Sequence, residues 1–383
     1  MSIYFNILVH FLIGVFILWP VQADAEEDNL RAMLGQMVIV GFRGQDIRSH
    51  DQIAEDIAAG RVGGVILFDY DSMLKKRGRN IADHEQLKGL VVRLQSVAML
   101  NPMRIPVPLF VSIDQEGGKV ARLKKSNGFR DFPSAETMGR ESASKVMEIG
   151  EDMGRMLYSY GINLNFAPVV DLNINPKSPA VGALGRSFSA SSKVVTEKAG
   201  AFLSGMQSSG VLGCLKHFPG HGSVSVDSHL GLTDISQSWS ETELEPYRKL
   251  IAASRVHMIM VGHLFNAKLD PDYPASMSHK VMTGLLRDKL GFAGVIVTDD
   301  MQMKAITEHY GLKEAVELAV LGGADLLVFG NNLDYDPLLP LKVRDILINL
   351  LQDGRLSRER AEASVRRIVE LKNSWVAPHK PAR

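Results

Sequence analysis

The chain contains 383 residues, of which 45% are hydrophobic and 22% charged, as is usual for a globular protein with a sizeable core. Its 43 Lys and Arg residues balance its 43 Asp and Glu residues, so no net charge favours binding to nucleic acid. The single cysteine, Cys214, excludes an intramolecular disulfide and a cysteine-based zinc site, and its apolar neighbours predict that it is buried.

The N-terminal segment has the pattern of a secretory signal peptide. Residues 7–19 are almost wholly apolar, and small residues suited to cleavage follow at 21–25, although residues 1–6 contain no Lys or Arg. The apolar run is shorter than the ~20 residues that a membrane-spanning helix needs. We therefore expect a signal peptide over residues 1–25 and an exported protein, periplasmic or secreted; the alternative is an anchor formed by an uncleaved N-terminal segment.

Short apolar runs and amphipathic stretches then alternate along the chain. Eight runs are typical of strands buried on both faces, at residues 37–41, 62–68, 108–114, 162–171, 210–217, 257–263, 294–299 and 324–330. Eight stretches have helical spacing, at residues 47–59, 82–100, 142–160, 192–209, 241–254, 278–290, 312–321 and 338–352. A last helix is predicted over 358–372, with Ser357 as its N-cap, and Ser240 is a similar candidate before Glu241.

This alternation predicts an α/β protein with a single (β/α)8 barrel of the TIM type and a C-terminal helix. The alternative is an open doubly wound sheet. Eight tandem units without an obvious break favour closure, and no Gly-x-Gly-x-x-Gly fingerprint follows the first strand. We expect the catalytic domain over residues 26–375 and a disordered tail over 376–383. The basic cluster at 75–79 is interpreted as a solvated loop.

Polar residues end at least five of the predicted strands. They are Asp114, Asp171, Lys216, His217, His263, Asp299 and Asp300. Because active sites of such barrels lie at the carboxyl ends of the strands, these side chains should converge on one mouth. Asp299 ends a rigid strand and suits a nucleophile or an electrostatic stabiliser, and strand alternation predicts that only one of Asp299 and Asp300 faces the substrate. The competing explanation is that Asp at a strand end caps the next helix.

The segment 216–229 gathers a lysine, three histidines and an aspartate on a loop that contains Pro and Gly. Asp227 and His229 are two residues apart, so the carboxylate can orient the imidazole and raise its proton affinity, as a general acid/base near neutral pH requires. The alternative is a solvated surface loop in which Pro219 and the glycines only make turns. His221 and His263 receive no assigned role.

Further polar groups suit a sugar. Asp114 can accept hydrogen bonds from neighbouring hydroxyls, and Arg122 and Arg186 can donate to hydroxyl or carbonyl oxygens. Salt bridges within the barrel are the competing explanation for either arginine.

Four motifs in this order resemble glycoside hydrolase family 3, in particular its NagZ-type β-N-acetylglucosaminidases (β-N-acetylhexosaminidases). They are Ile-Asp-Gln-Glu-Gly-Gly at 113–118 with Arg122, Gly-Arg-Ser-Phe at 185–188, Lys-His-Phe-Pro-Gly-His-Gly at 216–222 with Asp-Ser-His at 227–229, and Val-Thr-Asp-Asp-Met at 297–301. The resemblance covers nearly the whole chain after the expected signal, and the third motif is the most diagnostic.

The resemblance implies a retaining exo-β-N-acetylglucosaminidase that needs no metal or cofactor. It implies that Asp299 is the nucleophile, His229 the general acid/base and Asp227 its partner. It further implies a set of residues that hold the terminal N-acetylglucosamine, namely Asp114, Arg122, Arg186, Lys216 and His217. The expected partner is a carbohydrate, from peptidoglycan fragments or chito-oligosaccharides, bound by a monomer that contacts no nucleic acid and is not inserted in a membrane after signal cleavage.

Alternatives remain open at this point. Within the same family, a β-glucosidase or a β-N-acetylglucosaminide phosphorylase would share these motifs. From other classes, a non-catalytic sugar-binding protein and a zinc-dependent barrel hydrolase are weaker interpretations.

Overall fold

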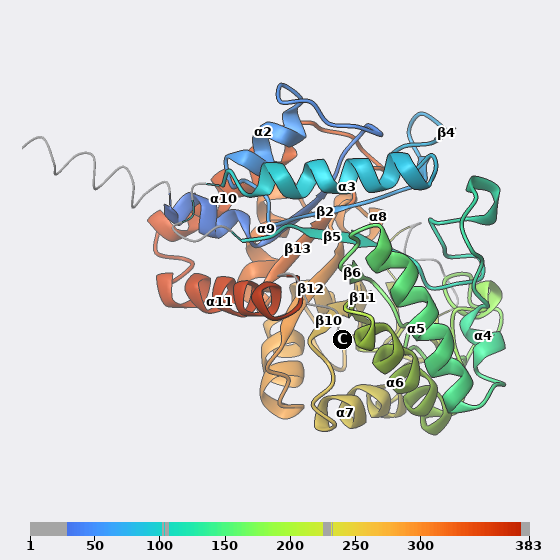
Figure 1. Cartoon of the computed structure of the whole chain (residues 1–383). Helices are drawn as coiled ribbons and strands as arrows, with labels where there is room; N and C mark the ends of the chain where they lie inside the picture. The colour runs from blue at the N-terminus through green and yellow to red at the C-terminus, as the bar shows by residue number, and fades with distance from the viewer. Residues whose placement is uncertain (1–28, 102, 104–106, 225–230, 232, 377–383) are drawn as a thin grey trace, which may run out of the picture.

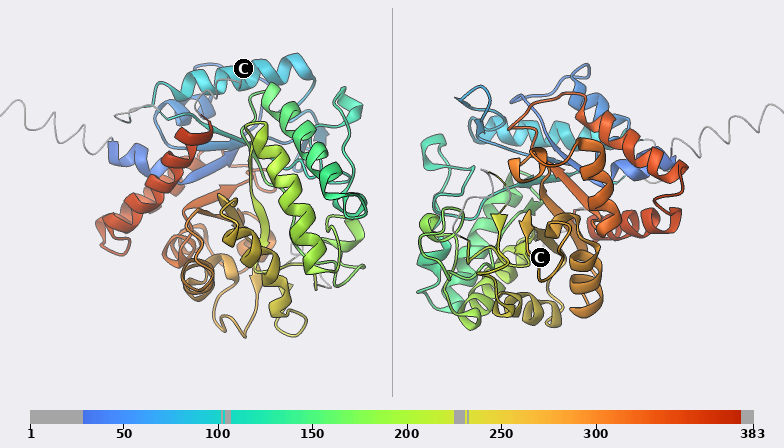
Figure 2. Two further views of the ribbon diagram at one scale, coloured as in Figure 1. Left: turned by 60° about the horizontal axis from the view of Figure 1, so that its bottom comes forward. Right: turned by 180° about the vertical axis from the view of Figure 1, so that it is seen from behind.

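The computed structural model describes residues 29–101, 103, 107–224, 231 and 233–376. The predicted signal peptide, and the predicted tail from residue 377 on, lie outside the described residues. In the described part, a central sheet is surrounded by helices (Figure 1), and the two views of Figure 2 show helices outside the sheet from further directions. The architecture is therefore the predicted α/β type.

The main sheet is parallel throughout, and its strand order is β7-β6-β5-β2-β1-β13-β12-β10-β8. Its strands are β1 Val38–Gly41, β2 Gly64–Ile66, β5 Phe110–Ile113, β6 Leu164–Asn165, β7 Leu212–Gly213, β8 Leu215–Phe218, β10 Met258–Val261, β12 Val295–Asp300 and β13 Leu326–Phe329. Only Cys214 separates β7 from β8, which stand at opposite ends of this order. The two ends of the sheet thus belong to one run of chain, and the sheet closes into a barrel. Each of the eight predicted runs contains a strand, with both β7 and β8 at 210–217, and the predicted barrel is confirmed.

Each predicted helical stretch contains a helix. The main ones are α2 Gln52–Ala58, α3 His84–Ala98, α5 Ala143–Ser159, α6 Ser192–Ser208, α7 Glu245–Ala252, the π-helix η5 Lys280–Lys289, α9 Leu312–Gly322, α10 Leu339–Gln352 and α11 Arg358–Trp375. Within the described residues, none has the combination of length and apolarity that crossing a bilayer would require.

Two details of the predicted helices differ. The stretch 241–254 is a 3-10 turn, η3 Glu241–Leu244, followed by α7, because Pro246 in the first turn of α7 has no backbone N–H to continue the earlier hydrogen bonding. Ser240 precedes η3 but forms no side-chain cap, whereas the Ser357 hydroxyl accepts the backbone N–H of Arg360 as predicted.

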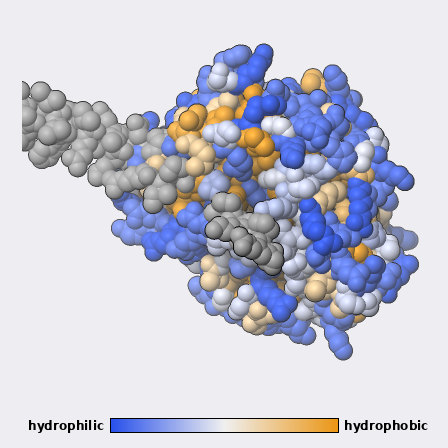
Figure 3. Space-filling view, viewed as in Figure 1, coloured by the Kyte–Doolittle hydropathy of each residue, from blue (hydrophilic) through white to orange (hydrophobic). Residues whose placement is uncertain are grey.

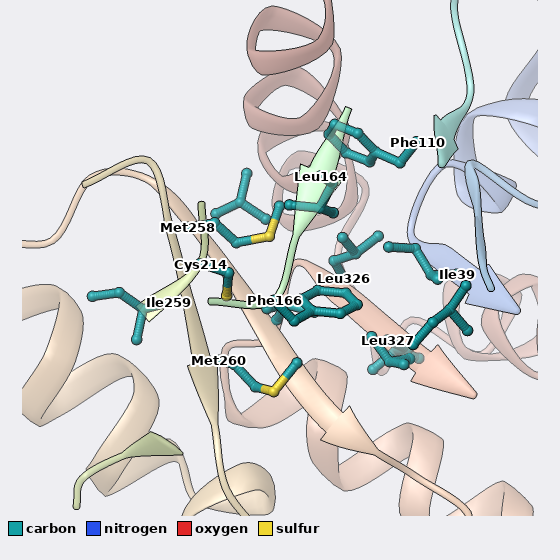
Figure 4. Packing of buried hydrophobic residues seen from close by; sticks show 14 of the residues in the cluster. Ile39, Phe110, Leu164, Phe166, Cys214, Met258, Ile259, Met260, Leu326 and Leu327 are labelled. Atoms are coloured by element: carbon teal, nitrogen blue, oxygen red, sulfur yellow. The ribbon is translucent and has the colours of Figure 1, made fainter. Parts of the chain in front are cut away.

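Apolar side chains from the strands fill the barrel. Figure 4 shows Ile39, Phe110, Phe166 and Met258 packed together with Cys214, which is fully buried as predicted. Burial of this thiol raises its pKa above the ordinary value, so it behaves as a small apolar side chain. On the outer face seen in Figure 3, polar residues cover most of the surface. The barrel is a filled scaffold, as is usual for this fold.

A short antiparallel hairpin, β3 Tyr70–Asp71 and β4 Lys76–Arg77, was not predicted, because two-residue strands leave no periodic pattern. Its second half falls in the basic cluster that was interpreted as a solvated loop. That interpretation is wrong for Arg79, which is 4% exposed and forms a salt bridge with Asp71. A second small pair, β9 Thr233–Asp234 and β11 Leu264–Phe265, is parallel.

Candidate active site

A cavity of about 340 Å³ opens where the main strands end. Most of the polar residues predicted for a site line it, although they come from distant parts of the chain. These are Asp114, Arg122, Arg186, Lys216, His217, Asp299 and Asp300. The convergence predicted from the strand ends is therefore present in the structure. Asp227 and His229, the predicted acid/base pair, lie outside the described residues.

Asp299 and Asp300 end β12, and both are half-buried. Both residues line the cavity, and the register between β12 and β13 shifts between Val297 and Asp300, so it stays a prediction that only one of the two carboxylates faces a substrate. Oδ1 of Asp299 accepts the N–H of Asp300 at 2.8 Å. Oδ1 of Asp300 instead accepts the N–H groups of Gln302 and Gly330, at 3.0 and 2.8 Å. Both carboxylates therefore accept backbone N–H groups, and that of Asp300 reaches beyond β12, to Gln302 and Gly330.

Five charged side chains form an alternating network on one wall of the cavity. Nζ of Lys216 lies 2.9 Å from Oδ1 of Asp114 and 2.8 Å from Oε1 of Glu116. Arg122 reaches Oδ2 of Asp114 at 3.3 Å. Arg186 donates from Nε and Nη2 to the two Glu116 oxygens, at 2.8 and 2.7 Å. Each charge has an opposite neighbour, which offsets much of the cost of burying it.

The network also decides the protonation states of its members. Burial alone would raise the pKa values of both carboxyls, but Lys216 and Arg122 hold that of Asp114 below its ordinary value. Arg186 and Lys216 lower the pKa of Glu116 to about 2. Burial would lower the pKa of Lys216, and the two carboxylates outweigh it and raise that pKa. Near neutral pH the wall therefore presents fixed charges to a ligand.

His217 is held from behind by Asp171. Its Nδ1 lies 2.7 Å from Oδ2 of Asp171, and Oδ1 of the same carboxylate accepts the N–H groups of His217 and His221. With Nδ1–H donated to the carboxylate, Nε2 faces Arg186 at 3.4 Å as an acceptor. Asp171 was predicted at the mouth, but it is 1% exposed and does not line the cavity. It orients His217 instead of meeting a ligand.

The two unassigned histidines differ. His221 lines the cavity, and its burial lowers its pKa to about 4, so it is neutral at pH 7. His263 was predicted at the mouth, but it does not line the cavity. Its Nε2 lies 2.9 Å from the carbonyl of Asp300 and its Nδ1 2.6 Å from the hydroxyl of Ser276. His263 therefore supports the end of β12 from outside the cavity.

A buried glutamate, Glu243 from η3, packs against the Pro-Gly-His-Gly segment at 219–222 and helps to explain why glycines occur there. Oε2 of Glu243 accepts the N–H of Gly222 at 3.0 Å. At Gly220, which has φ +127°, a Cβ would lie 2.6 Å from the Cβ of Glu243, and at Gly222 it would lie 1.6 Å from the carbonyl oxygen of Leu172. Burial and the charge of Asp171 raise the pKa of Glu243 to about 7. At these two positions after β8 the backbone thus lies too close to its neighbours for any residue but glycine.

Three roles were not predicted from the sequence: Glu116 in the charged wall, Glu243 as the acceptor for Gly222, and Asp171 as the residue that orients His217. A signal existed for Glu116, because it lies two residues after Asp114 and such spacing on extended chain places side chains on the same side. Glu243 lies on an ordinary amphipathic stretch and carries no such signal. In the part of the chain that the structure describes, no three His, Cys, Asp or Glu side chains are grouped to hold a metal ion.

Comparisons with known proteins show what the chain is similar to. The pattern of the Glycosyl hydrolase family 3 N terminal domain matches residues 29–371. The chain is 32% identical to Beta-hexosaminidase A of Pseudoalteromonas piscicida, over 89% of this chain and 60% of that protein. It is 37% identical to the Beta-hexosaminidase of Tolumonas auensis, over 71% of this chain and 76% of that protein.

Among solved structures, a glycoside hydrolase family 3 β-N-acetylglucosaminidase from Paenibacillus sp. FPU-7 superposes with a TM-score of 0.82 and 34% identity, covering 92% of this chain and 64% of that one. A β-N-acetylhexosaminidase from Beutenbergia cavernae superposes with a TM-score of 0.80 and 27% sequence identity, covering 90% of this chain and 98% of the other. The chain therefore spans less than two thirds of the Pseudoalteromonas and Paenibacillus proteins.

Proposed function

The chain belongs to glycosyl hydrolase family 3, and on that premise we propose that it is a retaining exo-β-N-acetylglucosaminidase. Its substrates are terminal β-linked N-acetylglucosamine units of peptidoglycan fragments or chito-oligosaccharides. One observation carries the proposal: Asp299 ends a barrel strand inside the same cavity as the paired charges of Asp114, Lys216 and Arg186. The names of its relatives, β-hexosaminidase and β-N-acetylglucosaminidase, support the same substrate class.

In the first step, a carboxylate oxygen of Asp299 attacks the anomeric carbon of the bound sugar. The bond from this carbon to the leaving oxygen breaks, and its electron pair stays on that oxygen. The imidazolium of His229, paired with Asp227, gives its proton to the leaving oxygen. The products are a glycosyl ester on Asp299 and the free aglycone.

In the second step, His229 takes a proton from water as the water oxygen attacks the same carbon from the opposite side. The ester bond to Asp299 breaks and the carboxylate is regenerated. Two inversions give net retention, so N-acetylglucosamine leaves as the β anomer. Using an Asp–His pair in place of a second carboxylate is the expected departure from most retaining glycosidases.

The charged wall gives a physical account of sugar binding. Asp114 keeps its charge and can accept hydrogen bonds from two vicinal hydroxyls, while Arg122, Arg186 and Lys216 can donate to ring substituents. Nε2 of His217 is directed toward Arg186, beside the same wall. Because these side chains are already held by one another, few of them must lose conformational freedom when the sugar binds, which lowers the entropic cost of binding.

The decisive test is hydrolysis of the 4-nitrophenyl β-glycosides by the purified protein. We expect release from the N-acetylglucosaminide, hardly any from the glucoside, and the β anomer as first product by NMR. Phosphate should not change the product; a sugar 1-phosphate would indicate a phosphorylase. Preference for the glucoside would instead indicate a β-glucosidase, and absence of turnover a sugar-binding protein.

We also propose that the protein is exported and acts as a monomer. Support for export comes from the apolar residues 7–19 and the small residues that follow them. N-terminal sequencing of protein recovered from the periplasm or medium should begin near residue 26. An intact N-terminus in the membrane fraction would favour the anchored alternative, and light scattering would measure the oligomeric state.

A further inference from the structure

The cavity has two chemically different parts. The wall described above is charged, whereas the opposite edge is formed by the β3–β4 hairpin and by residues that follow β13. Tyr70 and Leu333 line this edge and remain 39% and 44% exposed. Ser72 and Asn332 line it beside them. An aromatic ring and a leucine left exposed at the mouth of a polar cavity form an apolar surface that no residue of the described chain covers.

Buried charges hold this edge in place. Asp71, next to Tyr70, accepts from Nε of Arg43 at 2.7 Å and from Nη1 of Arg79 at 2.6 Å. The hydrogen bond from Arg43 is the largest of the effects that lower the pKa of Asp71 to about 2. Asn332 then ties the hairpin to the chain after β13, since it donates to the carbonyl of Tyr70 at 3.1 Å and accepts the N–H of Ser72 at 2.9 Å.

The same edge is connected to the strand that carries Asp299. Gln302 donates its N–H to Asp300 and accepts the N–H of Asn331 on its side-chain oxygen at 2.6 Å. The carbonyl of Asn331 accepts from Nη2 of Arg79 at 2.6 Å. Tyr70 is thus placed relative to the proposed nucleophile through fixed hydrogen bonds, which is the arrangement expected of a binding surface and not of a loose loop.

We propose that Tyr70 forms the floor of an acceptor subsite, on which a second pyranose ring, the leaving group, stacks. This inference rests on the proposed function. If the charged wall holds the sugar that is cleaved, the leaving group extends past Asp299 to the edge that Tyr70 and Leu333 make. A pyranose has an apolar C–H face and a hydroxyl rim. The ring of Tyr70 fits the face. Ser72 and Asp69 also line the cavity and carry a hydroxyl and a carboxylate suited to the rim, with Oδ2 of Asp69 already bound to Nζ of Lys124 at 2.5 Å.

The inference predicts selectivity for the aglycone. Binding energy from a remote part of a substrate is used at the reacting centre, so a sugar aglycone should raise kcat/KM above that of an aglycone too small to reach Tyr70. The two substrates to compare are N,N′-diacetylchitobiose and methyl β-N-acetylglucosaminide, whose leaving groups are both alkoxides. We expect Tyr70→Ala to lower kcat/KM for the disaccharide about tenfold and to leave the methyl glycoside within about twofold.

Two control variants accompany Tyr70→Ala. Tyr70→Phe keeps the ring and should retain the preference for the disaccharide. Tyr158→Ala removes a tyrosine of α5 that is 47% exposed and does not line the cavity, so it should change neither substrate. Equal losses on both substrates, or none on the disaccharide, would overturn the acceptor subsite.

A binding measurement keeps this test separate from that of the proposed function. In the Asp299→Ala background, calorimetry should show tighter binding of the disaccharide than of the methyl glycoside, and Tyr70→Ala should remove most of that difference. If the wild type hydrolyses neither sugar, the proposed activity is wrong, and the titration still decides the subsite: the same affinity with and without Tyr70 would refute it.

Discussion

Glu116 and Arg186, which lie 70 residues apart in the chain, form a bidentate ion pair in the wall of the cavity, with both side chains at most 11% exposed. Lys216 shares the same carboxylate. Removing the negative charge would leave two buried cations with only Asp114 to balance them. Glu116 therefore stabilises the folded site by balancing Arg186 and Lys216, and it also lines the cavity.

Glu116→Gln should destabilise the protein by roughly 3 kcal/mol, because breaking a buried ion pair leaves an uncompensated charge. Urea unfolding at pH 7 measures this. The matched control is Glu136→Gln, which breaks an exposed pair with Arg140 and should change stability far less. Similar unfolding midpoints for the two variants would contradict the assignment.

Asp299→Ala should lower turnover of the 4-nitrophenyl glycoside by roughly 10³-fold or more while sugar binding survives, since the nucleophile is lost and the charged wall is intact. Added azide should restore part of the rate and give the α-glycosyl azide, because the small anion attacks once from the side that the carboxylate occupied. Normal activity without azide would remove Asp299 from the mechanism.

His229→Ala should slow substrates in proportion to the basicity of their leaving groups. Protonation matters little for 4-nitrophenolate and a great deal for a sugar alkoxide, so the loss on the disaccharide should exceed that on the nitrophenyl glycoside by at least about tenfold. Steady-state kinetics on the two substrates measures it. Equal losses would argue that His229 has another role.

Glu243→Gln should change how stability depends on pH. In the folded protein the pKa of Glu243 is raised from 4.5 to about 7. Its contribution to stability is therefore fully present below pH 4.5 and is lost as pH rises through about 7. Glutamine keeps an acceptor for Gly222 but does not ionise. The variant should gain stability relative to wild type between pH 4.5 and 7, as measured by urea unfolding at several pH values; a constant difference would be inconsistent with this.

Lys372 on α11 is fully buried, with Nζ 2.6 Å from Oε1 of Gln36 and from the carbonyl of Gly63, and burial lowers its pKa from 10.5 to about 7. Between pH 7 and 10.5 the unfolded chain binds a proton that the folded chain does not, so this group makes stability rise with pH. The steepest slope that this one group can give is an increase of about 1.4 kcal/mol in the free energy of unfolding per pH unit.

Replacing it as Lys372→Met should remove that slope. Urea unfolding of both proteins from pH 7 to 9.5 measures the difference. The free energy of unfolding of the wild type should increase relative to that of the variant as the pH rises. Lys372→Arg is the opposite control, because arginine stays charged and should be destabilising throughout the range. Parallel stability curves for wild type and Lys372→Met would show that the lysine keeps its ordinary pKa in the fold.

Periodicity was enough to predict the scaffold. Buried parallel strands must be apolar on both faces, and helices packed on a barrel must be apolar on one, so the runs at 37–41 or 294–299 and the helix at 192–209 could be assigned from residue order. Parallel strands in a barrel end at one mouth, so Asp114, Lys216 and Asp299 could be expected to meet there. Short elements such as the β3–β4 hairpin carry too few residues for a pattern.

By itself, then, the sequence determined the barrel, the mouth and most of the residues around it, because these follow from local spacing. Only the tertiary structure decided which polar side chains pair: Glu116 with Arg186, Asp171 with His217, and Lys372 with Gln36, which lies 336 residues away. A pairing of that kind depends on distances of a few ångströms between separate elements, and residue order does not contain them. For the same reason the positions predicted for Asp171 and His263 at the mouth were wrong. Asp171 orients His217 instead, and His263 contacts the carbonyl of Asp300.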